Sequence, residues 1–143
     1  MRHVTVFFES KIAKLFTFMP NFSTIMLFGM VFTEEKSLDQ ETINHEWYHT
    51  MQYRDLFSVG LLLTFIISSI IGLCDLNPIW WAIGGLVLSS TLYYIWYGIE
   101  YLINYIKLKN KNKAYHAIKF EKQAYALQGD FLSPYKHFSW LKF

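Results

Sequence analysis

Two long stretches without a charged residue limit what this chain can fold into. Residues 56–74 are 19 consecutive uncharged residues, and residues 79–99 are another 21. A helix needs about 20 residues to cross the roughly 30 Å hydrocarbon core of a bilayer. The alternative is a pair of buried helices in a soluble protein, but a chain of 143 residues could hardly surround both. The sequence therefore predicts two membrane spans, at residues 56–74 and 79–106.

The residues that flank these stretches predict how the spans are oriented. Residues 74–78 (CDLNP) leave room only for a tight turn, so the spans should form a helical hairpin. Arg54 precedes the first span and Lys107 to Lys113 contribute four lysines after the second, whereas the turn contains neither Lys nor Arg. Because positively charged flanks stay in the cytoplasm, we expect both termini and the polar segments there. Aromatic residues gather at both ends of the second span, as they do at water–lipid interfaces: Trp80, Trp81, Tyr93, Tyr94, Trp96, Tyr97, Tyr101 and Tyr105.

The composition is consistent with an integral membrane protein, with the lipid bilayer as its partner. Hydrophobic residues make up 53% of the chain and charged residues 17%. The net charge of +2 is explained by topology and by contact with anionic lipid, so no nucleic-acid partner is expected. Glu9, Lys11 and Lys14 interrupt the N-terminal segment, so it does not resemble a signal peptide. Cys74 is the single cysteine, which excludes an internal disulfide and a cysteine-rich zinc site.

The N-terminal segment is expected to form a small β element over residues 3–33. Residues 3–8 and 24–33 are rich in β-branched and aromatic residues, which favour strands. Pro20 and Asn21 mark a break between them. The segment KIAKLFTFM between the two is expected to form a short helix at the membrane interface, with its lysines reaching toward water.

Two further helices are expected outside the membrane. The sequence S-x-x-Q at residues 37–40 fits a capping box, so a helix should run over residues 38–54. Residues 112–128 should form a last helix, with Gly129 as its C-terminal cap. The aromatic and basic tail, residues 130–143, is expected to lie along the membrane surface.

The first of these helices contains the spacing H-E-x-x-H at His45, Glu46 and His49. Residues four apart lie on the same helix face, so both imidazoles could point at one metal ion. Glu46 would stand beside them as a base for a water molecule whose pKa the metal lowers. By chance, this spacing occurs in roughly one chain in 50 to 100 of this length, so the motif alone does not establish a metal site. The alternative is a helix with two surface histidines and a surface glutamate.

A zinc site also needs a third protein ligand, and Glu121 is the best candidate. It lies in the middle of the last predicted helix, and Ala117 and Ala124 flank it by one turn. These small neighbours would let that helix approach another closely while the longer carboxylate reaches across. A helical hairpin returns the chain to the side that it left, so Glu121 could meet the two histidines. The alternative is a solvated Glu121 that pairs with Lys119 or Lys122.

The pattern H-E-x-x-H followed beyond membrane segments by E-x-x-A resembles the gluzincin zinc metallopeptidases. It is most similar to the membrane-embedded CAAX-prenyl endopeptidases, the heat-shock membrane endopeptidases and the BlaR/MecR-type sensor peptidases. A set of short bacterial membrane proteins has a similar FExxAY segment. In the named peptidases the second motif is E-x-x-A-D, and its Asp supports a ligand histidine; this chain has Tyr125 at that position.

The resemblance implies a fold class and a set of roles. The fold would be a mainly α integral membrane protein: a single zincin-like domain over residues 1–143, with a two-span hairpin, cytoplasmic active-site helices and a small N-terminal β element. His45, His49 and Glu121 would bind Zn²⁺, and Glu46 would be the general base and acid. The substrate would be a peptide or a membrane protein. The strand before the first active-site helix could hold it by strand addition.

Two supporting roles remain open among several residues. Candidates for stabilising the oxyanion are His116 and Tyr125, with Tyr48 a weaker one. A ligand histidine usually donates its other N–H to a fixed acceptor, and Tyr125, Gln128 or Glu41 could provide it.

Three classes of function are compatible with these residues. The leading one is a membrane-bound zinc endopeptidase. The second is another membrane metalloenzyme, such as a lipid-modifying hydrolase or a di-iron oxidase, although di-iron sites usually use more carboxylates. An intramembrane protease would place H-E-x-x-H inside a span, whereas Glu41, Arg54 and Asp55 flank it here. The third is a catalytically inactive membrane adaptor. The sequence indicates no oligomeric state.

Overall fold

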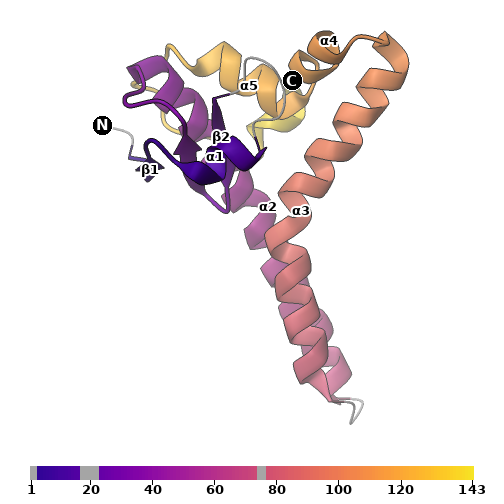
Figure 1. Cartoon of the computed structure of the whole chain (residues 1–143). Helices are drawn as coiled ribbons and strands as arrows, with labels where there is room; N and C mark the ends of the chain where they lie inside the picture. Colours follow the sequence, from indigo (N-terminus) through magenta and orange to yellow (C-terminus); the bar gives the residue numbers. More distant parts are fainter. Residues whose placement is uncertain (1–2, 17–22, 74–76) are drawn as a thin grey trace. The chain divides into compact units, whose positions relative to one another are not determined.

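A computed structural model describes residues 3–16, 23–73 and 77–143 of the chain. The chain divides into two compact units, one formed by Met1–Gln52 with Lys119–Phe143 and the other by Tyr53–Ile118. Helices dominate, and a small sheet lies near the N-terminus (Figure 1). These features confirm the mainly helical class and the N-terminal β element. Residues 20–21 and most of the turn between the spans lie outside the described residues.

The helix that carries H-E-x-x-H, α2, is much longer than the predicted 38–54. It runs without interruption over Gln40–Leu73, so the predicted first span is its second half. The helix also begins two residues later than expected. Asp39, and not Ser37, caps it: the Asp39 Oδ1 atom accepts the backbone N–H of Thr42 at 2.7 Å. A carboxylate in this position satisfies one of the free amides of the first turn.

The second unit contains the rest of the predicted hairpin. Helix α3 covers Pro78–Leu108 and starts with an Asn77 side chain that accepts the N–H of Ile79. The short helix α4, Lys111–His116, follows. Helices α2 and α3 are both long and apolar enough to cross a membrane. Only 6% and 11% of their most apolar windows are buried, so the chain itself does not cover these apolar faces.

Two glycines let α2 and α3 pack backbone against backbone. A Cβ atom on Gly60 would lie 2.7 Å from Ser89 of the facing helix, and one on Gly85 would lie 2.4 Å from Thr64. The two hydroxyl side chains each donate to the backbone of their own helix, Thr64 to the Gly60 carbonyl and Ser89 to that of Gly85. Small residues with inward hydroxyls are how helices approach closely in lipid.

The first unit begins with a three-stranded sheet, in the order β1-β3-β2. Strand β1 is only Val6–Phe7 and pairs in parallel with β3, Met30–Thr33; β2, Thr24–Leu27, pairs with β3 antiparallel. The predicted strand 24–33 is thus a hairpin. Its turn, Phe28 and Gly29, has positive φ at both residues (51° and 80°), as in a type I′ turn.

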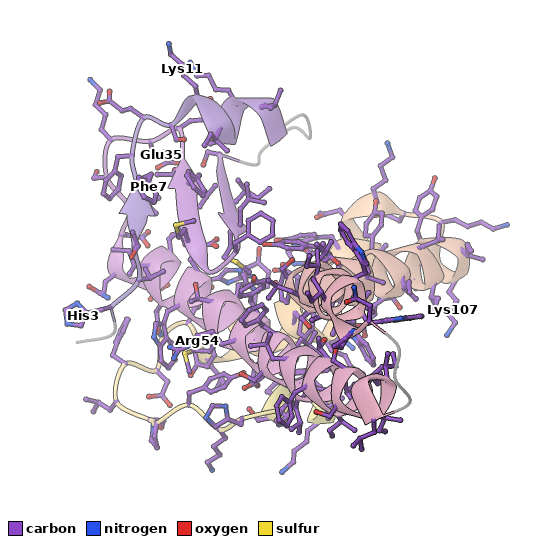
Figure 2. All side chains as sticks on the ribbon, turned by 90° about the horizontal axis from the view of Figure 1, so that it is seen from below. His3, Phe7, Lys11, Glu35, Arg54 and Lys107 are labelled. Carbon is purple, nitrogen blue, oxygen red and sulfur yellow. The ribbon has the colours of Figure 1, made fainter. Side chains whose placement is uncertain are left out.

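The predicted short helix between these strands is present as α1, Lys11–Phe16. Ala13 faces inward and is fully buried, whereas Lys11 and Ile12 are exposed. Lys11 points away from the sheet, while Phe7 lies on β1, where its ring stacks on Phe32 at 4.9 Å (Figure 2). Membrane contact of this helix stays a prediction.

The C-terminal region departs from the predicted single helix 112–128. The chain breaks at Ala117 and Ile118 between α4 and a separate helix α5, Lys119–Leu127. Gly129 is not a left-handed cap, since Gly29 alone has positive φ among the glycines that the structure describes.

The tail packs in part against α5, and its contact with a membrane surface stays a prediction. A 3-10 helix, η1, covers Ser139–Lys142, and its Trp140 is 2% exposed. The Trp140 ring packs edge-on against Phe120 of α5, at 4.7 Å between ring centroids. The end of the chain therefore contributes Trp140 to the core of the first unit.

The close approach of α2 and α3 gives a first prediction. The change Gly85→Ala places a methyl group against Thr64, so the helices must separate, and we expect a loss of about 1–3 kcal/mol. Gly84→Ala is the matched control, because a Cβ atom there meets nothing within 4 Å. Thermal unfolding of the detergent-solubilised variants measures the difference. Equal stability of the two variants would contradict this packing.

Candidate metal centre

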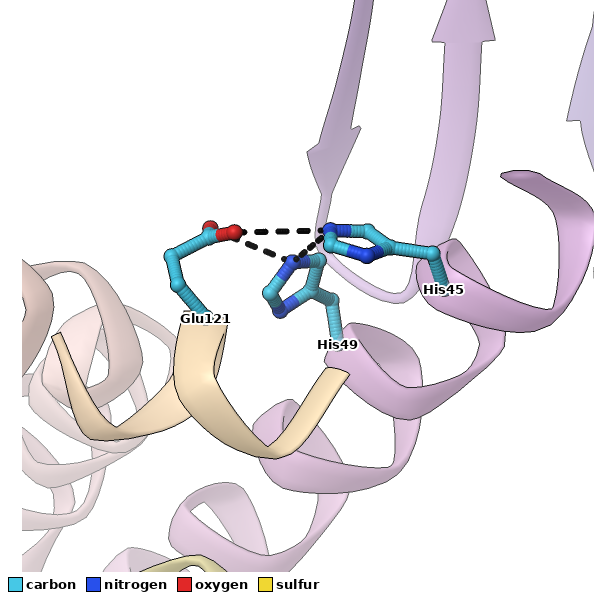
Figure 3. Close-up of side chains that lie close together, drawn as sticks. All are labelled: His45, His49 and Glu121. Carbon is cyan, nitrogen blue, oxygen red and sulfur yellow. Dashed lines mark hydrogen bonds and ion pairs between the residues drawn. The ribbon is translucent and has the colours of Figure 1, made fainter. Parts of the chain in front are cut away.

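Three buried side chains of the first unit converge: His45 and His49 of α2 and Glu121 of α5 (Figure 3). The two Nε2 atoms of the histidines are 3.0 Å apart. The Glu121 carboxylate lies 3.2 Å from Nε2 of His49 and 3.4 Å from Nε2 of His45. The i, i+4 spacing on one helix places the imidazoles on the same face, and α5 supplies the carboxylate from a separate element. The structure thus brings together the three side chains predicted as metal ligands.

This geometry fits a metal ion. Four ligands at about 2.0–2.1 Å in a tetrahedron are roughly 3.3 Å from one another, close to all three separations found here. Two imidazoles and one carboxylate leave a fourth position open, which is the composition of a catalytic site. The group of His45, His49 and Glu121 could therefore hold a metal ion. Its ligand types suit zinc without excluding other divalent ions.

Both candidate ligand histidines have an amide oxygen at their second nitrogen. Gln128 Oε1 lies 3.2 Å from Nδ1 of His45. Gln128 was one of the three acceptors that the sequence suggested for a histidine of this group. Gln52 Oε1 lies 2.9 Å from Nδ1 of His49. A carbonyl oxygen can only accept, so each Nδ1 donates a hydrogen and each Nε2 is directed to the centre. The sequence analysis missed Gln52, although its i+3 spacing from His49 could have indicated the contact.

His49 and Glu121 form a buried pair of opposite charges, and each shifts the pKa of the other. Burial lowers the pKa of the His49 imidazole, but the adjacent Glu121 carboxylate outweighs it and raises that pKa to about 9. Burial raises the pKa of the Glu121 carboxyl. The charge of His49 and hydrogen bonds from both histidines outweigh this effect and bring the Glu121 pKa well below its ordinary value. In the metal-free protein, an imidazolium and a carboxylate therefore neutralise each other at neutral pH.

Glu46, the predicted general base, is also buried, with 8% of its surface exposed. Burial raises the pKa of its carboxyl, while the nearby charges of His49 and His45 oppose the rise. The carboxyl therefore binds a proton more readily than an ordinary surface glutamate. A general base that later acts as an acid requires this property.

The other predicted residues occupy different surroundings. Tyr125 packs edge-on against the His45 ring, at 4.6 Å between centroids, and is 44% exposed. Tyr48 is buried beside Trp47, with ring centroids 5.1 Å apart. His116 is exposed on α4 of the second unit, so its distance from the metal group stays untested. Glu41 lies in the first turn of α2 and is exposed.

Asn44 ties the histidine helix to the end of the glutamate helix. Its buried Nδ2 group donates to the carbonyls of Leu127, Gln128 and Asp130. The last carbonyls of a helix lack partners within the helix, so this side chain does what Gly129 was predicted to do. Since Asn44 directly precedes His45, the same contact fixes α5 beside the metal group.

Replacing Asn44 tests this contact. Asn44→Asp keeps the size of the side chain but turns its donors into acceptors that face carbonyl oxygens, so we expect a loss of about 1–3 kcal/mol. Asn77→Asp is the matched control, because Asn77 uses only an acceptor oxygen to cap α3. Chemical denaturation of both variants makes the comparison, and equal losses would contradict the assigned role of Asn44.

A third prediction concerns protons. A metal ligand must have lost its proton, and the pKa of His49 lies at about 9 without metal, so binding near neutral pH should release about one proton. Glu121 releases none, because it is already charged. The apparent affinity should then rise about tenfold per pH unit up to about 9 and level off above it. Calorimetric titration with zinc in buffers of different ionisation enthalpy counts the protons; a count of zero would contradict the pairing of His49 with Glu121.

No protein-family model, curated protein or solved structure shows a significant match to this chain. The resemblance to gluzincins therefore rests on the motif residues alone and stays a prediction. What the protein does has to be inferred from the chemistry of the metal group and its neighbours.

Proposed function

We propose that this protein is a membrane-bound zinc endopeptidase with Glu46 as its general base. One observation carries the proposal: His45, His49 and Glu121 converge at metal-binding distances, and a buried glutamate with a raised pKa stands on the same helix beside them. This combination matches the needs of hydrolysis, which are a Lewis acid, an open position and a proton acceptor.

In this proposal the ligands and the base have separate tasks. A zinc ion held by these residues would supply Lewis-acid chemistry for hydrolysis of the peptide bond. Glu46 would take a proton from the attacking water and pass it to the nitrogen of the leaving amine, so one water adds across the broken bond. His45, His49 and Glu121 fix the site of attack from two helices.

The oxyanion that forms during attack needs a hydrogen-bond donor. Tyr125 is the candidate with the best support, because its ring contacts His45 and nearly half of its surface is open to solvent. Tyr48 is less suitable, since it is only 2% exposed. His116 remains a candidate from the sequence.

The membrane part of the proposal is supported by the apolar helices. The uncharged half of α2 starts seven residues after His49, on the same continuous helix. With Arg54 before this half and four lysines after α3, the metal group would lie on the cytoplasmic side of a bacterial inner membrane. A substrate would then be a peptide or a membrane-protein segment near that surface.

The rival functions have less support. Within residues 3–16, 23–73 and 77–143, the metal-ligating side chains form one group with a single carboxylate ligand, whereas di-iron sites use several. An inactive adaptor would have no use for a buried cluster of ionisable groups, which is costly to desolvate.

Metal content is the first test. Detergent-purified protein should contain close to one zinc per chain by elemental analysis, and His49→Ala and Glu121→Ala should each lose it. Both variants must retain the helical circular dichroism of the wild type. A wild-type protein free of metal after chelator-free purification would refute the proposal.

Activity separates the base from the ligands. Glu46→Gln should keep its zinc but lose peptide cleavage by about 10²–10⁴-fold, the usual contribution of a general base. Glu41→Gln is the matched control, an exposed glutamate on the same helix that should cleave normally. Mass spectrometry of new N-termini in a pool of bacterial membrane proteins follows cleavage. Undiminished cleavage by Glu46→Gln would exclude the assigned mechanism.

A further inference from the structure

A chain of buried hydrogen bonds runs from the ligand His49 to the C-terminal end of the protein. Gln52 accepts from the His49 ring through Oε1, and its Nε2 donates to Gln123 Oε1 at 2.9 Å. Gln123 Nε2 then donates to the Ser139 hydroxyl at 2.6 Å. Gln52 and Gln123 are both fully buried, so no solvent competes for these contacts.

Two backbone carbonyls fix the direction of every bond in this chain. The Ser139 hydroxyl donates to the carbonyl of Lys136, so its oxygen is available to accept from Gln123. Nε2 of Gln52 donates to the carbonyl of Phe120 at 3.1 Å as well as to Gln123. A carbonyl can only accept, so neither amide can be turned around without facing an oxygen to an oxygen. The oxygen of Gln52 is thereby held toward His49.

This direction determines which nitrogen of His49 faces the metal group. With a fixed acceptor at Nδ1, the neutral ring has its hydrogen there, and the lone pair of Nε2 points toward His45 and Glu121. An acceptor of this kind orients a metal-binding imidazole and makes it a stronger ligand. Gln128 has no comparable anchoring contact to hold its oxygen at His45 among the hydrogen bonds of the described residues.

We propose that Gln52 is a positioning residue that fixes the tautomer and orientation of His49, and that Gln123 and Ser139 hold Gln52 in place. The 3-10 helix η1 thus supports the metal centre through Gln123 and Gln52. Trp140, buried against Phe120, anchors Ser139 at the end of the chain of bonds. The inference rests on the metal site of the proposed function, but not on peptidase activity.

Two substitutions at Gln52 separate positioning from packing. Gln52→Met keeps the volume but removes the acceptor, so zinc affinity should fall about 10–100-fold. Gln52→Glu keeps an acceptor for Nδ1–H, although its second oxygen faces the Phe120 carbonyl and Gln123 Oε1, so affinity should fall less than in Gln52→Met. Stability should follow the opposite order, since Glu introduces a buried charge and Met does not. A purely structural Gln52 would give the same order for affinity and stability.

The measurement is zinc affinity of the full-length protein by competition with a chromophoric chelator, beside thermal unfolding. Thr50→Val is the control on the same helix; its hydroxyl has no hydrogen-bond partner among the described residues and should be dispensable. Wild-type affinity in Gln52→Met, or equal losses in the Met and Glu variants, would overturn the proposal.

The far end of the chain of bonds is tested by Ser139→Ala. Removing its hydroxyl frees the amide of Gln123 to rotate, so zinc affinity should fall several-fold, less than in Gln52→Met. Ser37→Ala, at an exposed serine, should leave affinity unchanged. An unchanged affinity in Ser139→Ala would show that η1 does not support the site.

A direct measurement covers the case in which the Gln52 variants fail to fold. Nitrogen-15 NMR of histidine-labelled, zinc-loaded wild-type protein reports which nitrogen of His49 carries hydrogen, with His49→Ala to assign the signal. Hydrogen on Nδ1 supports the proposal, and hydrogen on Nε2 overturns it. If the wild type binds no zinc, the proposed zinc peptidase function is refuted. The same spectrum, recorded at alkaline pH where the His49 ring is neutral, then still tests the role of Gln52.

Discussion

Burying ionisable side chains between two helices is the constraint on which the first unit depends. Two imidazoles and two carboxylates are enclosed there, and each would be costly to bury alone. The pairing of His49 with Glu121 removes most of the net charge, and glutamine oxygens satisfy the outer nitrogens of both rings. These requirements explain why amide side chains, rather than aliphatic ones, fill so much of the space between α2 and α5.

The meeting of His45, His49 and Glu121 could be predicted from sequence because spacing on a helix determines the direction of the two histidines. His45 and His49 are four residues apart, and the small neighbours of Glu121 indicated a helix that packs closely, so the three could be expected to meet. Asn44 could not be found in this way, because its partners are carbonyls at the end of another helix, whose positions follow only from the packed structure.

Some predicted boundaries of helices and strands were wrong, and the structure gives a local reason for each. Gly29 lies inside a strand-like sequence, and its positive φ makes a turn where a continuous strand was expected. Asp39, and not the predicted Ser37, caps α2. Asp and Ser both suit an N-cap position, so the sequence alone does not choose between them. The two apolar helices were easier to identify, since length and the absence of charge are properties of the sequence itself.

The contact of Asn44 with the end of α5 also makes the length of that helix part of the metal site. Asn44 holds the carbonyls at Leu127 and beyond, while Glu121 must reach the histidines six residues earlier. Each residue turns an α-helix by about 100°. One residue inserted between Glu121 and Leu127 would rotate the Glu121 carboxylate away from His45 and His49, while Asn44 still held the end of α5. Keeping Glu121 beside His45 and His49 therefore depends on the number of residues between Glu121 and Leu127 as well as on Glu121 itself.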